Sequence, residues 1–259
     1  MQQWGVLYRK ELTEMVRNYK ILWIPLVFIL LGVMQPISSY YMPEILDNFG
    51  GLPEGAIIEM PLPTGAEVLI SVLSNYGMLG VLILVLSAMG IVSAERRSGV
   101  AGMVMSKPVA YSSYILSKWA GVVTITLLSF LIGYLASWYY TNLLFESVAT
   151  VDILKSFAIY SLWLILVVTL TLFFSTIMKE NGSAAFITIL VIVVASTVTS
   201  LLKNKLEWSP SNLTGHTGHL LQTGELQSSF LPVLLITIAL IILILVLTIQ
   251  IFKRKEILE

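Results

Sequence analysis

The stretch SAERRSGVAGMVMSKPVAYSSYILSKW, residues 93–119, interrupts an otherwise strongly apolar chain. It sets the charged triplet ERR, two glycines and a KP pair between two long apolar runs. Charged side chains at the end of an apolar helix reach the headgroup layer of a bilayer and fix that end there. The stretch therefore predicts a polar hairpin outside the membrane that connects two membrane-spanning helices.

The composition of the whole chain is that of a membrane protein. Its 259 residues are 57% hydrophobic and 12% charged, with a mean hydropathy of +0.88, whereas soluble domains carry about 25% charged residues. The net charge of +0 gives no electrostatic support for binding to nucleic acid. The absence of cysteine excludes disulfides and thiol catalysis. We therefore expect the lipid bilayer to be the main solvent of this chain.

Six apolar runs reach the roughly 20 residues that one helix needs to cross a bilayer. They lie at residues 21–41, 68–92, 114–140, 152–178, 183–202 and 230–252. We predict an all-α integral membrane protein with six transmembrane helices, in which residues 21–259 form a single six-span domain.

The distribution of Lys and Arg predicts the orientation of these helices. With the N-terminus inside, 12 of the 15 basic residues fall on the inner side, and the other three are Lys155, Lys203 and Lys205. Cytoplasmic loops of membrane proteins carry an excess of Lys and Arg. We therefore expect a multi-pass protein of the cell membrane with both termini and residues 93–113 in the cytoplasm. Residues 42–67 should form a turn-rich cap outside, and the polar segment 203–229 should lie on the outer membrane surface.

Residues 1–20 have the pattern of an amphipathic helix that precedes the first span. Its aromatic and aliphatic side chains recur at spacings of three and four, as Trp4, Tyr8, Leu12 and Met15. Basic side chains take other positions around the helix, and a helix with these two faces lies in the membrane interface. We predict an interfacial helix here; the alternative is a juxtamembrane extension without a role.

The hairpin at residues 93–113 has the features of a docking element. Gly99 and Gly102 allow a sharp bend, and Lys107-Pro108 ends any helix that follows it. The apolar side chains on one face of that short helix are Val100, Met103 and Val104. Methionine adapts to many surfaces, and an apolar face exposed in the cytoplasm requires a partner. We therefore expect a short helix that binds another protein.

Motifs for catalysis, nucleotide binding and metal binding are not found. The sequence has no G-x-x-x-x-G-K-[ST], H-E-x-x-H or G-x-S-x-G, so we assign no catalytic residue, metal site or cofactor. The middles of the spans carry no charged residue or histidine, which disfavours ion-coupled transport. Lys118, Asp152 and Lys155 lie near span ends, where they can snorkel. His216 and His219 are too few ligands for structural zinc, and we expect them in a solvated loop.

Mild polar and small residues within the spans have two interpretations. They are Gln35, Ser71, Asn75, Ser196 and Thr199, together with the small pair Gly90 and Ala94. The polar side chains could line a pathway for an amphipathic solute, or they could bond neighbouring helices to one another. The small pair could receive a helix of a partner subunit or a helix of the same chain.

The hairpin and its surroundings resemble ABC-2-type permeases, the membrane subunits of bacterial ABC exporters. These carry E-R-x-x-G-T-x-x-x-L-L-S-x-P-V-S after the second span, and here the stretch ERRSGV is followed by MSKPV. YSSYILSK at 111–118 resembles the family's path into the third span, and YRKELTEMVRNYKILW resembles its N-terminal element. The chain departs where Val100 replaces a threonine and Ala110 a small hydroxyl residue. With the topology, the resemblance covers nearly the whole chain.

The resemblance implies a fold of the ABC-2, or type V exporter-like, kind and a separate ABC ATPase that docks on residues 95–107. ATP and Mg²⁺ would be bound by that ATPase, and a second permease subunit, identical or different, would complete the transporter. The N-terminal helix would be the connecting helix beside the ATPase. The ATPase-docking residues would be Glu95, Arg96, Arg97, Gly99, Val100, Met103, Val104, Lys107 and Pro108.

Two other functions stay open at the level of sequence. One is an ABC-2-like membrane subunit that couples to an ATPase for sensing or envelope maintenance without bulk export. The other is a six-helix scaffold or a membrane enzyme of another kind. ATP-dependent movement of a solute would distinguish export from sensing, and turnover of a lipid by the chain alone would favour an enzyme. The solute itself is not identified by the sequence.

Overall fold

The computed structural model describes residues 2–49, 62–202 and 205–258, and within these ranges the chain is helical and has no strand. Six helical segments are long and apolar enough to cross a membrane, which confirms the predicted all-α, six-span class. They are Lys20–Ile45, Gly65–Arg97, Tyr111–Leu144, Thr150–Ile177, Asn181–Leu201 and Phe230–Lys255.

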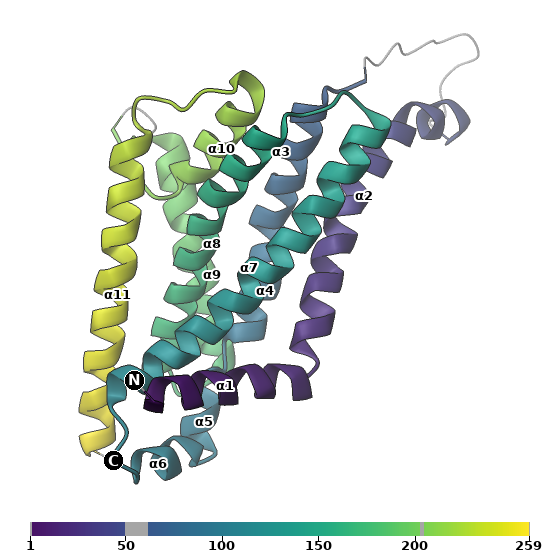
Figure 1. Ribbon diagram of the computed structural model, residues 1–259. Helices are drawn as coiled ribbons and strands as arrows, with labels where there is room; N and C mark the ends of the chain where they lie inside the picture. Colours follow the sequence, from purple (N-terminus) through teal and green to yellow (C-terminus); the bar gives the residue numbers. More distant parts are fainter. Residues whose placement is uncertain (1, 50–61, 203–204, 259) are drawn as a thin grey trace.

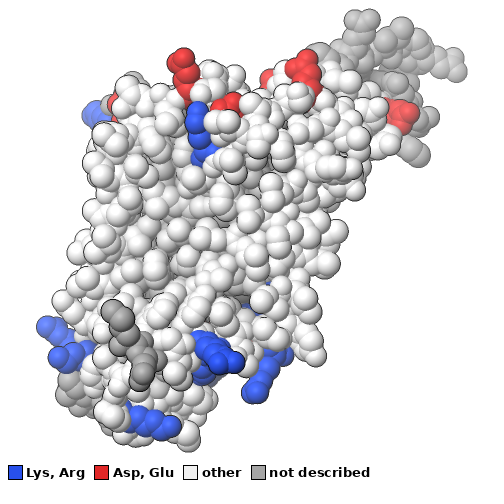
Figure 2. Space-filling view, viewed as in Figure 1, with Lys and Arg blue, Asp and Glu red and all other residues white. Residues whose placement is uncertain are grey.

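The elements follow one another as α1 (Gln2–Arg17), α2 (Lys20–Phe49), α3 (Gly65–Asn75), the π-helix η1 (Tyr76–Gly80), α4 (Val81–Ala88), α5 (Ser93–Arg97), α6 (Val100–Met105), α7 (Tyr111–Leu144), α8 (Thr150–Ile177), α9 (Asn181–Leu201), α10 (Asn212–Thr223) and α11 (Phe230–Leu258). In Figure 1, α1 lies across one end of the bundle, where α5, α6 and both termini are found, and α10 lies at the opposite end. Most of the visible Lys and Arg side chains gather at the end with α1 and α6, and the visible Asp and Glu at the other (Figure 2). We call the end with α1, α5 and α6 the basic end.

Helix α2, which forms the first span, is longer than the sequence indicated. It continues to Phe49 with Pro43 inside it, so the predicted turn-rich cap at 42–67 is wrong for residues 42–49. An internal proline frees a carbonyl oxygen of the preceding turn, and membrane helices tolerate it because neighbouring groups and local adjustments of the helix satisfy that oxygen. Residues 50–61 of the expected cap lie outside the described part of the chain.

The second span begins at a capping box in which Thr64 and Glu67 satisfy each other's backbone N–H groups.

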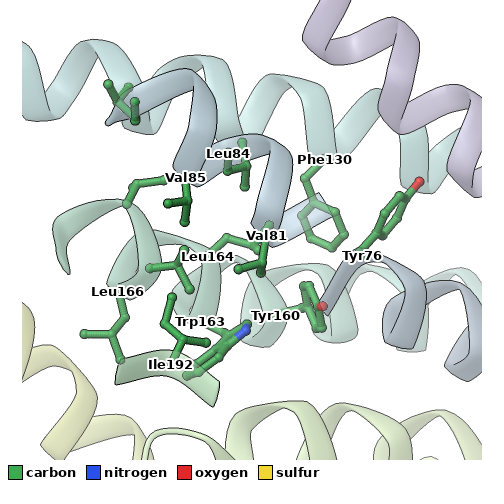
Figure 3. Packing of buried hydrophobic residues seen from close by; sticks show 14 of the residues in the cluster. Tyr76, Val81, Leu84, Val85, Phe130, Tyr160, Trp163, Leu164, Leu166 and Ile192 are labelled. Atoms are coloured by element: carbon green, nitrogen blue, oxygen red, sulfur yellow. The ribbon is translucent and has the colours of Figure 1, made fainter. Parts of the chain in front are cut away.

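The second span changes helix type in its middle, where η1 separates α3 from α4. A π-helical turn shifts the backbone hydrogen bonds, and carbonyl groups near it need other donors. The hydroxyl group of Tyr160 on α8 donates to the carbonyl oxygen of Leu73 at 2.7 Å. Figure 3 shows Tyr160 and Tyr76 on either side of Phe130 in the aromatic core beside this turn. The distortion is thus stabilised by a neighbouring helix.

Helices α2 and α7 cross at close range at Gly32 and Gly133. A Cβ atom on Gly32 would lie 2.6 Å from the carbonyl oxygen of Gly133, and one on Gly133 would lie 2.7 Å from the carbonyl oxygen of Phe28. Small residues let membrane helices approach each other in this way. The hydroxyl group of Tyr76 fills the same corner and donates to the Phe28 carbonyl at 2.8 Å. This contact between two glycines was not predicted from the sequence.

Candidate functional site

The hairpin at the basic end contains the short helix that the sequence predicted. The chain bends after α4, and the backbone N–H groups of Val92 and Ser93 donate to Ser175 Oγ on α8. Gly99 then adopts the left-handed conformation, with φ of 78°, which other residues rarely take. Helix α6 follows immediately and ends before Pro108. Gly99 therefore lies at the turn between α5 and α6, whereas Gly102 lies inside α6 with open space around it.

An apolar groove of about 510 Å³ separates α6 from the first turns of α1. It is lined by Gln3, Val6, Leu7, Lys10, Val100, Met103, Val104, Lys107 and Val109. Met103 is 71% exposed and Val6 is 69% exposed, while Val100 and Val104 are half-buried in its wall. Gln3 Nε2 closes one edge by donating to the Pro108 carbonyl oxygen at 2.9 Å. The apolar face of α6 is therefore half of a larger surface, and α1 supplies the other half.

A buried network of ion pairs lies behind this groove. Lys118 on α7 has a side chain that is 1% exposed, and its Nζ lies 3.0 Å from Glu11 Oε1 and 2.9 Å from Glu95 Oε1. The two carboxylates come from α1 and α5, so one ammonium group joins three helices. A buried charge of this kind persists only with opposite charges around it. The network therefore fixes α1 and the hairpin to the start of α7.

Lys10 extends the same network toward the surface. Its ammonium group contacts Glu11 at 3.2 Å, Glu14 at 3.4 Å and Glu95 at 2.5 Å. Burial alone would lower the pKa of Lys10, but the hydrogen bond to Glu95 and the charge of Glu11 outweigh burial and raise that pKa above its ordinary value. Lys10 is therefore charged at every physiological pH. The hydroxyl group of Tyr114 donates to the other oxygen of Glu95 at 2.6 Å.

Three carboxylates of this network, on Glu11, Glu14 and Glu95, bring oxygen atoms within 4.8 Å of one another. Such spacing also occurs in sites for hard cations. Here two ammonium groups already contact these oxygens. We therefore describe the cluster as an ion-pair network and assign no metal to it.

Two expectations about charged residues are wrong. Glu95 was expected at the membrane surface within the docking element, but it points inward with a side chain that is 11% exposed. Lys118 was expected to snorkel, but α1 covers it and supplies Glu11 as its partner. Arg97 does lie on the surface, where it pairs with Glu180 at 3.2 Å. Arg96 donates to the carbonyl oxygen of Thr176 at 3.3 Å, at the end of α8.

Helix α1 packs its expected apolar stripe on α7. Met15 is buried and Leu12 half-buried, and Tyr8 forms a 2.8 Å hydrogen bond with the Thr124 hydroxyl group. Trp4 stacks on Tyr8 with ring centroids 5.3 Å apart and is 40% exposed. The stripe thus docks on the bundle, and the Trp4 ring keeps an open face.

The residues considered for a pathway are dispersed in the structure. Asn75 Nδ2 donates to Gln35 Oε1 at 2.9 Å, which joins the first two spans. Ser71 donates to the carbonyl oxygen of Glu67 within its own helix. Thr199 is buried and bonds to the Ser209 hydroxyl group at 2.7 Å. These contacts favour the interpretation as hydrogen bonding within the chain.

The small pair on the second span also packs within the chain. A Cβ atom on Gly90 would lie 2.9 Å from Asn181 Nδ2 and 3.4 Å from the Cβ atom of Ala94. Asn181 begins α9, so the pair brings the second and fifth spans together at the basic end. The two helices separate toward the other end, where a cavity of about 670 Å³ opens between them and Ser196 lines it.

The segment 205–229 contains a short helix, which the sequence allowed, but this helix is buried against the bundle more than a segment on the membrane surface would be. The helix is α10, which packs against α8 and α3. Leu213 and Leu220 are fully buried, and His216 is 3% exposed, whereas His219 is partly accessible and bonds to the Glu225 carbonyl oxygen. Leu213 and Leu220 are seven residues apart, about two helical turns, so a helix places them on one face. That spacing was the signal that could have revealed the buried face of the helix.

Comparison with known proteins identifies the family. The family described as "Protein of unknown function (DUF2705)" matches residues 56–258. The chain belongs to the DUF2705 family. A relative from Bacillus subtilis (strain 168), described as "Uncharacterized transmembrane protein YxlG", is 36% identical over 250 residues, which cover 96% of this chain and 97% of the relative. The DUF2705 match includes the hairpin, α7 and every later span, and the relative is a transmembrane protein, in agreement with six apolar helices.

Proposed function

We propose that this chain is the membrane-spanning subunit of an ATP-driven ABC exporter and works with a separate ATPase and a second permease subunit. The observation that carries the proposal is the apolar groove between α1 and α6. Met103 and Val6 are exposed in it at the end of the bundle where Lys and Arg gather. Basic residues mark the cytoplasmic side of membrane proteins, so the groove faces the compartment that holds ATP. An exposed apolar surface there fits a protein partner.

The ion-pair network supports a role for this groove in force transmission. Glu95 at the base of the hairpin contacts Lys118 of α7 and Lys10 of α1. A partner that displaces α6 therefore also displaces the start of a membrane-spanning helix. This is the mechanical link that a permease driven by an external ATPase requires.

The cavity between the second span and α9 supports a path for the solute. Its polar groups are the hydroxyl groups and backbone of residues such as Ser74, Ser196 and Thr197, and no charged side chain lines it. In the proposed transporter, the second permease subunit closes the open side of this cavity. The described spans offer an uncharged amphipathic environment there, which fits an amphipathic solute.

The chain itself carries no ATP site in this proposal, because its sequence has no phosphate-binding loop. ATP and Mg²⁺ are bound by the partner ATPase. We therefore expect no ATP hydrolysis by the purified chain and hydrolysis by the complex with its ATPase.

The test replaces Met103 with Asp in the groove. A charge without a partner in an apolar contact typically costs several kcal/mol, and about 2.7 kcal/mol already weakens binding roughly a hundredfold. We expect Met103→Asp to reach the membrane at wild-type levels but to lose the co-purifying ATPase and its ATP hydrolysis. Quantitative mass spectrometry and ATPase assays of the tagged protein from its native host provide the measurement.

Leu226→Asp is the matched control, because Leu226 is 46% exposed in the loop after α10 at the opposite end. It should leave ATPase binding unchanged. Retention of the ATPase by Met103→Asp at the wild-type level would show that the groove is not its docking site. An ATPase that binds and hydrolyses ATP without moving any solute in vesicles would favour the sensing function over export.

A further inference from the structure

Helix α10 covers one end of the cavity between the second span and α9. Thr214, Gly215 and Gly218 of α10 line that cavity. Gly218 faces Ile70 of α3, since a Cβ atom on Gly218 would lie 3.9 Å from the Ile70 side chain. The opposite face of α10 is buried and holds Leu213 and Leu220 against the bundle. The position of α10 therefore decides how wide this end of the cavity opens.

His216 lies on the buried face of this covering helix. The residue is 3% exposed, and its ring packs edge-on against Phe230 with centroids 5.8 Å apart. Its Nδ1 atom is enclosed and has no hydrogen-bond partner in the described part of the chain. A neutral imidazole tolerates this site at a modest cost, but an imidazolium needs an acceptor or water at both nitrogens.

In the described part of the chain, no charged or titratable side chain is hydrogen-bonded to His216 Nδ1. Glu67 on α3 is held in the capping box with Thr64, and Asp152 on α8 faces Lys155 at 3.9 Å. The hydroxyl group of Tyr160 on α8 donates a hydrogen bond to the carbonyl oxygen of Leu73, as described above. The outer half of α11 has no ionisable side chain. Burial lowers the pKa of His216 below its ordinary value, and the nearby His219 lowers it further.

We propose that His216 is a proton-binding site that controls whether α10 stays packed over the cavity. With α10 packed, the imidazole is neutral and fills its apolar position beside Phe230. Protonation favours the state in which α10 has moved away and the ring reaches water. Acidification on the side of the membrane that α10 faces would therefore open that end of the cavity.

The sign of the pH dependence follows from linkage. His216 has a lower pKa when α10 is packed than when it is released, so the released state binds more protons. The packed state is favoured above the ordinary histidine pKa of about 6.5 and loses that advantage as the pH falls below it. Between the two pKa values, each pH unit shifts the equilibrium toward release by up to about tenfold.

A single cysteine at Thr217 reports this movement, because the chain has no other cysteine. Thr217 is fully buried on the packed face of α10, and Thr→Cys is a small change. The rate of thiol labelling in purified protein is measured from pH 7.5 to pH 5. Each rate is divided by the labelling rate of Ser228→Cys, an exposed position in the following loop. This division is needed because any thiol becomes less reactive as the pH is lowered. The ratio then reports accessibility alone.

We expect the ratio to rise by about tenfold or more between pH 7.5 and pH 5 with His216 present. His216→Phe keeps an aromatic ring against Phe230 without a titratable group, and the ratio should become independent of pH. His219→Gln is the matched control and should keep a smaller rise, because His219 then no longer lowers the pKa of His216 in the packed state. A flat ratio with His216 present, an equal rise in His216→Phe, or loss of the rise in His219→Gln would each overturn the proposal. The readout needs neither ATPase nor transport, so it fails or succeeds independently of the proposed function.

Discussion

The two halves of α7 are held in the bundle by different interactions. In the first half, Lys118 is buried between the carboxylates of Glu11 and Glu95. In the second half, Gly133 lies against the backbone of Phe28, and Tyr134 shares a 2.7 Å hydrogen bond with Ser156. The first half combines buried charge with neutral contacts such as the Tyr8–Thr124 hydrogen bond, whereas the second half is held by close approach and neutral hydrogen bonds.

The difference teaches where this fold can place charge. The first half of α7 lies at the basic end, where α1 crosses the bundle and brings countercharges to Lys118 (Figure 1). Deeper in the span, an unpaired charge costs far more than a neutral contact. The inner helix crossings therefore use glycine and hydroxyl groups, which require no countercharge.

Lys118→Met should have the largest effect. It leaves Glu11 and Glu95 buried with Lys10 as their remaining cationic partner among the described residues, and removing one member of a buried ion pair costs about 3–5 kcal/mol. We expect a large loss of folded protein, measured as the fraction that stays monodisperse after heating in detergent. Lys155→Met removes an exposed lysine 3.9 Å from Asp152 and should cost less than about 1 kcal/mol. Equal stability of the two variants would contradict the conclusion that Lys118 holds α1 and the hairpin against α7.

Gly133→Ala tests the other half of the helix. The new Cβ atom would meet the Phe28 backbone at 2.7 Å, so the crossing must open, and overpacking of this kind costs about 1–3 kcal/mol. Thermal unfolding against Gly5→Ala measures the effect, since nothing lies within 4 Å of a Cβ atom at Gly5. The Gly5 variant should be neutral or slightly stabilised because alanine favours helices. A Gly133 variant as stable as the Gly5 variant would mean that the crossing is loosely packed.

Tyr134→Phe should have the smallest effect. It removes the hydrogen bond to Ser156 and leaves Ser156 bonded to the carbonyl oxygen of Ile153. Hydrogen bonds between membrane helices average about 0.6 kcal/mol, so the melting temperature should fall only slightly. Tyr139→Phe, at a tyrosine that is 63% exposed, should change nothing. A loss as large as that of Lys118→Met would remove the distinction between the two halves.

The sequence predicted the parts of this fold that depend on local pattern. The length of each apolar run was enough to predict the six spans. Gly99 and Pro108 were enough to predict the short helix between the second and third spans. The pairing of Glu11 with Lys118 depends on which helix covers which, and periodicity carries no such information. Lys118 within an otherwise apolar run was the available signal, because a lysine there needs either water or a carboxylate. The burial of α10 was missed because its polar residues resembled a solvated loop.

The ion pairs of Lys118 with Glu11 and Glu95 also determine when the N-terminal helix can dock during synthesis of the protein. Glu11 precedes Lys118 by 107 residues, so the ribosome completes α1, two spans and the hairpin before the shared cation exists. A nascent chain that ends before the third span carries Glu11 and Glu95 without the ammonium group that later lies between them. The N-terminal helix can therefore complete its docking only after the third span has been inserted, and until then Lys10 is the cation that Glu11 and Glu95 share.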